Sequence, residues 1–72
     1  MKNKWEIQHY ELTKKEFELM LYNANSKKPL DVAPYQDNEN GKRIWLYYVN
    51  DVHVATWHGG KSGSVFKNQI AV

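Results

Sequence analysis

The sequence predicts an α+β fold: a single small domain, residues 1–72, in which one helix packs on a mostly antiparallel sheet. Three observations lead to this prediction. Residues 44–57 have the pattern of a β-hairpin, a helix-capping signal follows residue 12, and short strand-like segments lie on both sides of the helix. The expected order is therefore β-α-β-β-β, with an optional further strand near the C-terminus.

The first strand and the helix are expected in the N-terminal third of the chain. Residues 5–12 alternate loosely between apolar and polar side chains, which is typical of a strand. Thr13 and Glu16 have the spacing of a capping box, and Leu12 with Phe17 has that of a hydrophobic staple, so the helix should begin at residue 14. Its apolar stripe, which should lie on the sheet, consists of Phe17, Met20, Leu21 and Ala24.

An edge strand and a turn are expected after the helix. Residues 30–36 form an extended piece that Pro29 and Pro34 confine to the edge of a sheet, because proline cannot donate to a central ladder. Residues 37–41 are polar and end in Asn-Gly, which predicts a turn into the hairpin.

The C-terminal part is expected to be less regular. Residues 58–64 contain three glycines and predict a flexible loop. Residues 64–72 predict a last strand or a docked tail, because they contain Val65, Phe66, Ile70 and Val72.

The hairpin is the most informative stretch. A two-residue loop at Asn50 and Asp51 would place Val49 opposite Val52, Tyr47 opposite Val54, Trp45 opposite Thr56, and Arg43 opposite His58. One sheet face would then carry Arg43, Trp45, Tyr47, Val49, Val52, Val54, Thr56 and His58, and the other Ile44, Leu46, Tyr48, His53, Ala55 and Trp57. Both sets are rich in apolar residues, so both faces of the hairpin need a cover.

The helix is expected to cover the face with Ile44, Leu46, Ala55 and Trp57, because these residues offer aliphatic bulk and one small side chain where a helix can approach. The other face is then open to a partner. In the alternative arrangement the C-terminal segment folds back over that face through Phe66 and Ile70, which would leave no interface there.

Composition sets the broad class. The chain has 72 residues, no cysteine and a formal net charge of +2, so it lacks disulfides and thiolate metal sites and is too mildly basic to indicate nucleic acid by charge alone. No stretch has the length of a membrane span and no secretory leader precedes the first strand. We therefore expect a cytoplasmic protein without a membrane association and without a cofactor.

Signals for chemistry are weak. Residues 55–62 are similar to a phosphate-binding loop, but the first glycine is alanine and the segment leads toward a strand instead of a helix. The three histidines lack metal-ligand spacing, which favours no metal site. His58, Lys61 and Arg43 form the one cluster suited to phosphodiester chemistry, and no nucleophile with an orienting acid accompanies them. The sequence thus favours a protein that is not an enzyme.

A protein interface fits the hairpin better, because interface centres favour Trp, Tyr and Arg over other charged residues. The predicted partner-binding residues are Arg43, Trp45, Tyr47, Thr56, His58 and Lys61. The expected partner is another protein or a second copy of the chain, as in many small regulators and inhibitors, including those of phages and mobile elements. The alternative is a single-stranded nucleic acid, whose bases would stack on the same aromatic face while flanking lysine and arginine residues neutralise the phosphates.

Overall fold

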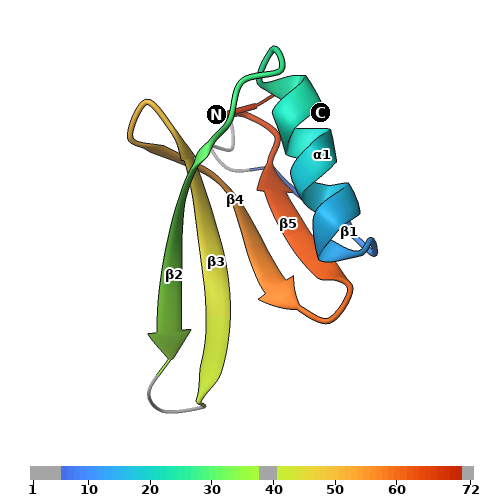
Figure 1. Cartoon of the computed structure of the whole chain (residues 1–72), viewed down its shortest axis with the longest axis vertical. Helices are drawn as coiled ribbons and strands as arrows, with labels where there is room; N and C mark the ends of the chain where they lie inside the picture. Colours follow the sequence, from blue (N-terminus) through green and yellow to red (C-terminus); the bar gives the residue numbers. More distant parts are fainter. Residues whose placement is uncertain (1–5, 38–40, 71–72) are drawn as a thin grey trace.

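The computed structural model describes residues 6–37 and 41–70 and shows one helix packed on one five-stranded antiparallel sheet (Figure 1). The elements follow the order β1 (Ile7–Tyr10), α1 (Lys14–Ala24), β2 (Asp31–Asp37), β3 (Lys42–Val49), β4 (Val52–Gly59) and β5 (Ser62–Phe66). The predicted α+β class is confirmed, and the optional last strand is present as β5.

The strands lie in the order β1-β5-β4-β3-β2, and each neighbouring pair is antiparallel. β1 and β2 are therefore the two edges, and the chain passes from one edge to the other through α1. The prediction that the proline-containing segment forms an edge strand is confirmed, since Pro34 lies within β2. β1 is shorter than the predicted strand, and the start of that prediction, with Trp5, lies outside the described residues.

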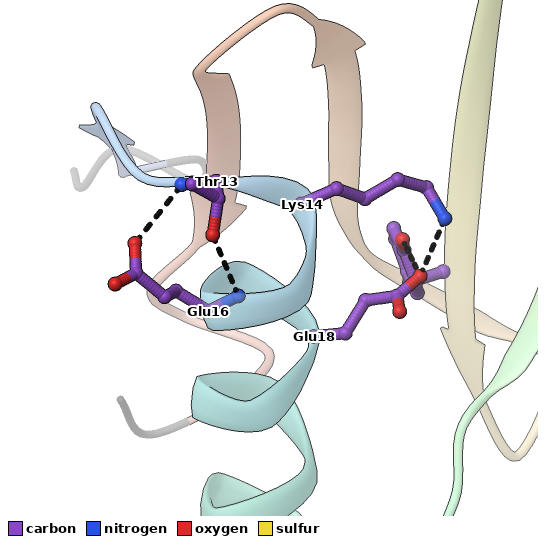
Figure 2. Close-up of polar contacts among 5 residues, drawn as sticks. Thr13, Lys14, Glu16 and Glu18 are labelled. Atoms are coloured by element: carbon purple, nitrogen blue, oxygen red, sulfur yellow. Dashed lines mark hydrogen bonds and ion pairs between the residues drawn. The ribbon is translucent and has the colours of Figure 1, made fainter.

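The helix begins where the sequence predicts. The Thr13 hydroxyl accepts a hydrogen bond from the Glu16 amide at 3.2 Å, and the Glu16 carboxylate accepts one from the Thr13 amide at 3.1 Å (Figure 2). Phe17 and Leu21 are fully buried, and Met20 and Ala24 pack against the core, so the predicted apolar stripe is confirmed. The helix ends at the Asn25 cap.

The core lies between α1 and one face of the sheet. The ring of Phe17 lies 5.3 Å from that of Trp57 and 5.9 Å from that of Tyr47, measured between centres. The buried apolar residues of the described chain are Phe17, Leu21, Tyr47, Val54, Ala55, Trp57, Val65 and Ile70. Ile70 belongs to this cluster, so the tail after β5 docks on the core instead of covering a second face.

The predicted flexible loop at residues 58–64 is wrong. β4 continues to Gly59 and β5 begins at Ser62, so only a tight turn separates the two strands. Gly59 and Gly60 have φ values of 108° and 59°, which glycine adopts without steric cost and which let the chain reverse at once. The glycines therefore indicate a hairpin turn and not a mobile segment.

Gly63 has a different role, because a Cβ atom there would lie 2.5 Å from the Phe17 ring. This glycine allows α1 to approach β5 closely. The predicted Asn-Gly turn ends at Gly41, whose φ of 67° suits a turn, while residues 38–40 lie outside the described part. In the chain that is described, no helix has the length and apolar character needed to cross a bilayer.

Candidate binding surfaces

The hairpin of β3 and β4 turns where the sequence predicts but does not keep the predicted register. Asn50 and Asp51 have φ values of 52° and 66°, as a two-residue hairpin turn requires, and Val49 pairs with Val52. Beyond this point a β-bulge shifts the pairing by one residue, so Tyr47 lies opposite Ala55. The predicted pairings of Tyr47 with Val54, of Trp45 with Thr56 and of Arg43 with His58 are therefore wrong.

The bulge changes which residues share a face, because one extra residue in a strand reverses the side of all those that follow. Val54 and Ala55, consecutive in the chain, are both buried in the core. Trp45 now pairs with Trp57, so both rings lie on the helix side. Ala55 and Trp57 lie under the helix as predicted, whereas Ile44 and Leu46, predicted beside them, lie on the opposite face by strand alternation.

The six predicted partner-binding residues are consequently divided among three places. Arg43, Trp45 and Tyr47 are on the helix side of β3. Thr56 and His58 are on the opposite side of β4, and Lys61 is exposed in the turn between β4 and β5. The prediction that these residues form one continuous face is wrong.

Trp45 and Tyr47 attach the helix to the sheet. The Tyr47 hydroxyl donates to a Glu18 carboxylate oxygen at 2.6 Å, and the Lys14 ammonium donates to the same oxygen at 2.8 Å. The ammonium also lies 4.7 Å from the centre of the Trp45 ring, which adds a cation–π contact. Figure 2 shows Lys14 reaching along the helix to Glu18. Tyr47 is 2% exposed, so its ring is an internal contact.

These contacts shift the pKa values of Glu18 and Tyr47. Burial favours the neutral form of Glu18, but hydrogen bonds from Lys14 and Tyr47 outweigh this effect and hold the pKa of the carboxyl below its usual value. Burial raises the pKa of Tyr47, and the hydrogen bond to Glu18 raises it further. At neutral pH Glu18 is therefore a carboxylate that accepts a hydrogen bond from the neutral phenol of Tyr47.

The sheet face that the helix leaves uncovered, called the uncovered face below, carries a different set of side chains. By register and alternation its described members are Ile7, His9, Asp31, Ala33, Tyr35, Ile44, Leu46, Tyr48, His53, Thr56, His58, Ser64 and Phe66. Ile7 and Tyr35, at the two edges, are 50% and 54% exposed. Asp31 is the one Asp, Glu, Lys or Arg among these described side chains, and the register adds the pair Asp37 and Lys42 at the far end of β2 and β3.

A hydrogen-bonded network occupies the part of the uncovered face formed by β1, β5 and β4. Ser64 Oγ lies 2.8 Å from His58 Nε2 and 3.0 Å from His9 Nδ1. A serine hydroxyl has one hydrogen, so it donates to at most one of these imidazoles, and any further hydrogen bond there requires the other ring to donate to it. On the neighbouring strand His53 Nε2 lies 2.9 Å from Thr56 Oγ1, and its ring stands edge-on to that of Phe66 with 5.0 Å between centres.

This network resembles a nucleophile with two bases but lacks the rest of a hydrolytic site. Ser64 is 9% exposed, and β5 lies between β4 and β1, so the backbone amides around the serine belong to an interior strand. An oxyanion needs free donors beside the nucleophile, and an interior strand does not offer them. Within the described residues no group of three or more His, Cys, Asp or Glu is arranged to hold a metal ion.

Sequence reasoning missed His9, Ser64 and Phe66 as members of a surface. The signal was present in the alternation of Ile7 with His9 and of Ser64 with Phe66, which pair across β1 and β5. The sequence alone does not pair the segment around Ser64 with β1, because Ser64 lies where the predicted loop meets the predicted last strand. A hollow of about 210 Å³ lies at the β1 side of the face, and it is lined by Ile7, His9, Thr56, His58, Ser64, Val65 and Phe66.

Comparisons with known proteins do not add to this geometry: no protein-family model matches the chain, and neither a curated protein nor a solved structure is similar enough to count as a match. The surfaces themselves are the basis for a functional proposal.

Proposed function

We propose that this protein is a small non-enzymatic binding protein, cytoplasmic as its cysteine-free sequence suggests, that pairs with a second copy of itself through the uncovered face. A dimer of this kind suits a regulator or inhibitor that acts by binding other proteins. The supporting observation is that the uncovered face combines exposed or half-buried apolar and aromatic side chains with few formal charges.

The chemistry of the face favours a second copy as the occupant. Two identical faces can meet only if they do not bring like charges together. The described side chains place just Asp31, on the edge strand β2, in this surface, and the two residues in register at its far end, Asp37 and Lys42, have opposite charges. Sheets that pack face to face are held about 10 Å apart by interdigitating side chains. Leu46, Tyr48 and Phe66 are half-buried in one chain and would be fully buried in such a pair.

Two neighbouring residues of β2 provide a matched test. Tyr35 and Gln36 are both exposed but point to opposite faces, because they alternate along one strand. Light scattering after size-exclusion chromatography should give about twice the mass of one chain for the natural protein and for Gln36→Glu. Tyr35→Glu places a charge on the uncovered face and should give the mass of a single folded chain, with circular dichroism as the check on folding.

A second variant tests a residue on an interior strand, because Tyr35 lies on the edge strand β2. Tyr48→Ala removes a half-buried ring from the interior strand β3 and should weaken self-association at least as much as Tyr35→Glu does. A single-chain mass for the natural protein at every concentration, or a dimer that survives both substitutions, would exclude the proposed pairing.

Single-stranded nucleic acid is the second candidate, supported by the rings of Tyr35, Tyr48 and Phe66 on one sheet face. Against it, Arg43 lies on the helix side, and Lys42, the lysine whose register position is on the uncovered face, is opposite Asp37 at the far end of the strands. Titration with a labelled single-stranded oligonucleotide at low and moderate salt tests it. If bases stack there, Lys61→Ala should weaken binding and reduce its salt dependence, and an absence of binding at low salt would rule this candidate out.

A further inference from the structure

The helix side of the sheet is covered unevenly. Ala55, Trp57 and Val65 on β4 and β5 are at most 3% exposed, whereas Val32 on β2 is 45% exposed. Five strands about 4.8 Å apart span roughly 19 Å, and a helix with its side chains is about 10–12 Å wide. A single helix thus covers about half of such a sheet, and Figure 1 shows α1 beside β5, with β2 at the far edge.

An apolar groove of about 380 Å³ lies between α1 and β2, on the part of the helix side that α1 does not cover. This α1–β2 groove is lined by Lys15, Glu18, Leu19, Tyr22, Val32 and Tyr47, among others. Leu19, Tyr22 and Val32 are 58%, 38% and 45% exposed, although each is a large apolar side chain. The groove therefore presents apolar surface on both of its walls.

The helix has a second apolar stripe that its own core does not use. Phe17 and Leu21 point into the core, while Leu19 and Tyr22, three residues apart, share the flank that borders the groove. An apolar stripe beside an exposed sheet surface is a place where another helix can pack, at the usual distance of about 8–10 Å between helix axes.

Lysine is the commonest charged residue around the groove. Lys15 lines it. The exposed Lys27 and Lys28 immediately precede Pro29, which also lines it, and Lys28 borders a neighbouring hollow whose lining includes Asp31. The acidic residue of the lining, Glu18, already accepts hydrogen bonds from Lys14 and Tyr47. The free charge around the rim is therefore positive, and it complements an acidic partner.

We infer that the α1–β2 groove binds an amphipathic helix of a partner protein, with apolar residues at i, i+3, i+4 and i+7 and with acidic residues beside that stripe. A second copy of the chain is a poor occupant, because its own Lys15, Lys27 and Lys28 would meet the same cations. This site is separate from the uncovered face and does not depend on the proposed pairing through it.

Three synthetic peptides test the inference. The first is an 18-residue helix with a leucine stripe and glutamate flanks, the second has the same stripe with lysine flanks, and the third is a scrambled form of the first. Fluorescence anisotropy should show saturable binding of the acidic peptide, binding at least tenfold weaker for the lysine peptide, and none for the scrambled one. Amide shifts in NMR spectra of the full chain should locate the contact at Leu19, Tyr22 and Val32.

Variants of the full chain then separate this site from the other surface. Leu19→Ser and Val32→Thr should each weaken binding of the acidic peptide at least fivefold. Val32→Thr keeps the shape and β-branching of valine. Tyr35→Ser removes similar exposed apolar area from the uncovered face and should leave peptide affinity unchanged. Lys15→Glu should weaken binding of the acidic peptide and strengthen binding of the lysine peptide.

The outcomes are distinct. Shifts that map to the uncovered face, equal affinity for the acidic and lysine peptides, or no saturation up to about 1 mM acidic peptide would each overturn the inference. Loss of dimer mass in Tyr35→Ser with intact peptide binding would support the groove independently of the proposed function, and failure to dimerise at all would not affect this test.

Discussion

The helix-covered face and the uncovered face belong to the same strands, but their side chains are held by different interactions. On the covered face Phe17 packs over Gly63 and against Trp57, so shape and apolar burial fix the arrangement. On the uncovered face Thr56 and Ser64 are 9% exposed and hydrogen-bond to histidine rings. The packing on the first face is expected to determine stability, and the second face is expected to determine self-association.

The strongest test of this comparison removes one large ring from each face. Trp57→Ala should cost about 3–5 kcal/mol, because the ring is 3% exposed and the surrounding core cannot collapse onto the cavity. That loss approaches the whole stability of a small domain, so we expect a largely unfolded chain in a thermal melt followed by circular dichroism.

The matched change is Tyr48→Ala on the uncovered face, where the ring is half-buried and lies 5.3 Å from that of His53. The substitution should leave a cooperative melt and lower the free energy of unfolding by less than about 2 kcal/mol. Trp45→Ala should also stay folded, because its ring is half-buried and the Lys14 side chain that it contacts is 40% exposed. A folded Trp57→Ala beside an unfolded Tyr48→Ala would reverse the comparison.

The next effect concerns the closest approach on the covered face. Gly63→Ala places a Cβ 2.5 Å from the Phe17 ring, which is fully buried and has no space to move into, so we expect a loss of about 1–3 kcal/mol. Urea denaturation measures it, with the exposed neighbour Ser62→Ala as the control.

A double-mutant cycle identifies the cause. If overlap with the ring is the cost, Gly63→Ala should be less damaging in a Phe17→Leu background than alone. Strictly additive losses would mean that Phe17 is not the residue that requires glycine.

Gly63 also shows why some of the fold could be predicted and some could not. The helix start depends on contacts within four residues, Thr13 and Glu16, so local spacing was sufficient to predict it. The edge strand followed from Pro34, which is a local restriction on hydrogen bonding. Gly63, in contrast, is required by Phe17, far away in the chain, and in isolation it looked like a flexible residue.

The candidate site was predicted less well because it depended on register. The turn at Asn50 and Asp51 was correct, but the bulge near Val54 has no turn residue or proline to mark it. One unpaired residue moved Thr56 away from Trp45 and brought Trp57 beside it. The composition of the hairpin thus indicated that two faces needed covers, while the identity of each face required the three-dimensional structure.

A smaller effect sharpens the comparison at the beginning of the helix. Thr13→Ala removes the oxygen that accepts from the Glu16 amide and should cost about 1 kcal/mol with the fold intact. Thr13→Ser retains the oxygen and should restore most of this loss. An unchanged denaturation midpoint in Thr13→Ala would show that the cap does not contribute to holding the helix on the covered face.

The smallest expected effect is electrostatic and arises from Glu18, the polar link between helix and sheet. Its pKa is lower in the folded chain than in the unfolded chain, so its carboxylate contributes stability above the unfolded value of about 4.3, and this contribution disappears as pH falls through the lower folded value. The stability difference between the natural chain and Glu18→Gln should therefore stay constant from about pH 7 to 5 and narrow toward pH 3. Because the Glu18 side chain is 42% exposed, solvent screens the pair with Lys14, and the difference should also shrink in high salt. In a Tyr47→Phe background the difference should be smaller at neutral pH, since one of the two hydrogen bonds to the carboxylate is gone. A difference that widens on acidification would mean that burial, which favours the neutral acid, dominates at this position, and that the covered face is held by apolar packing alone.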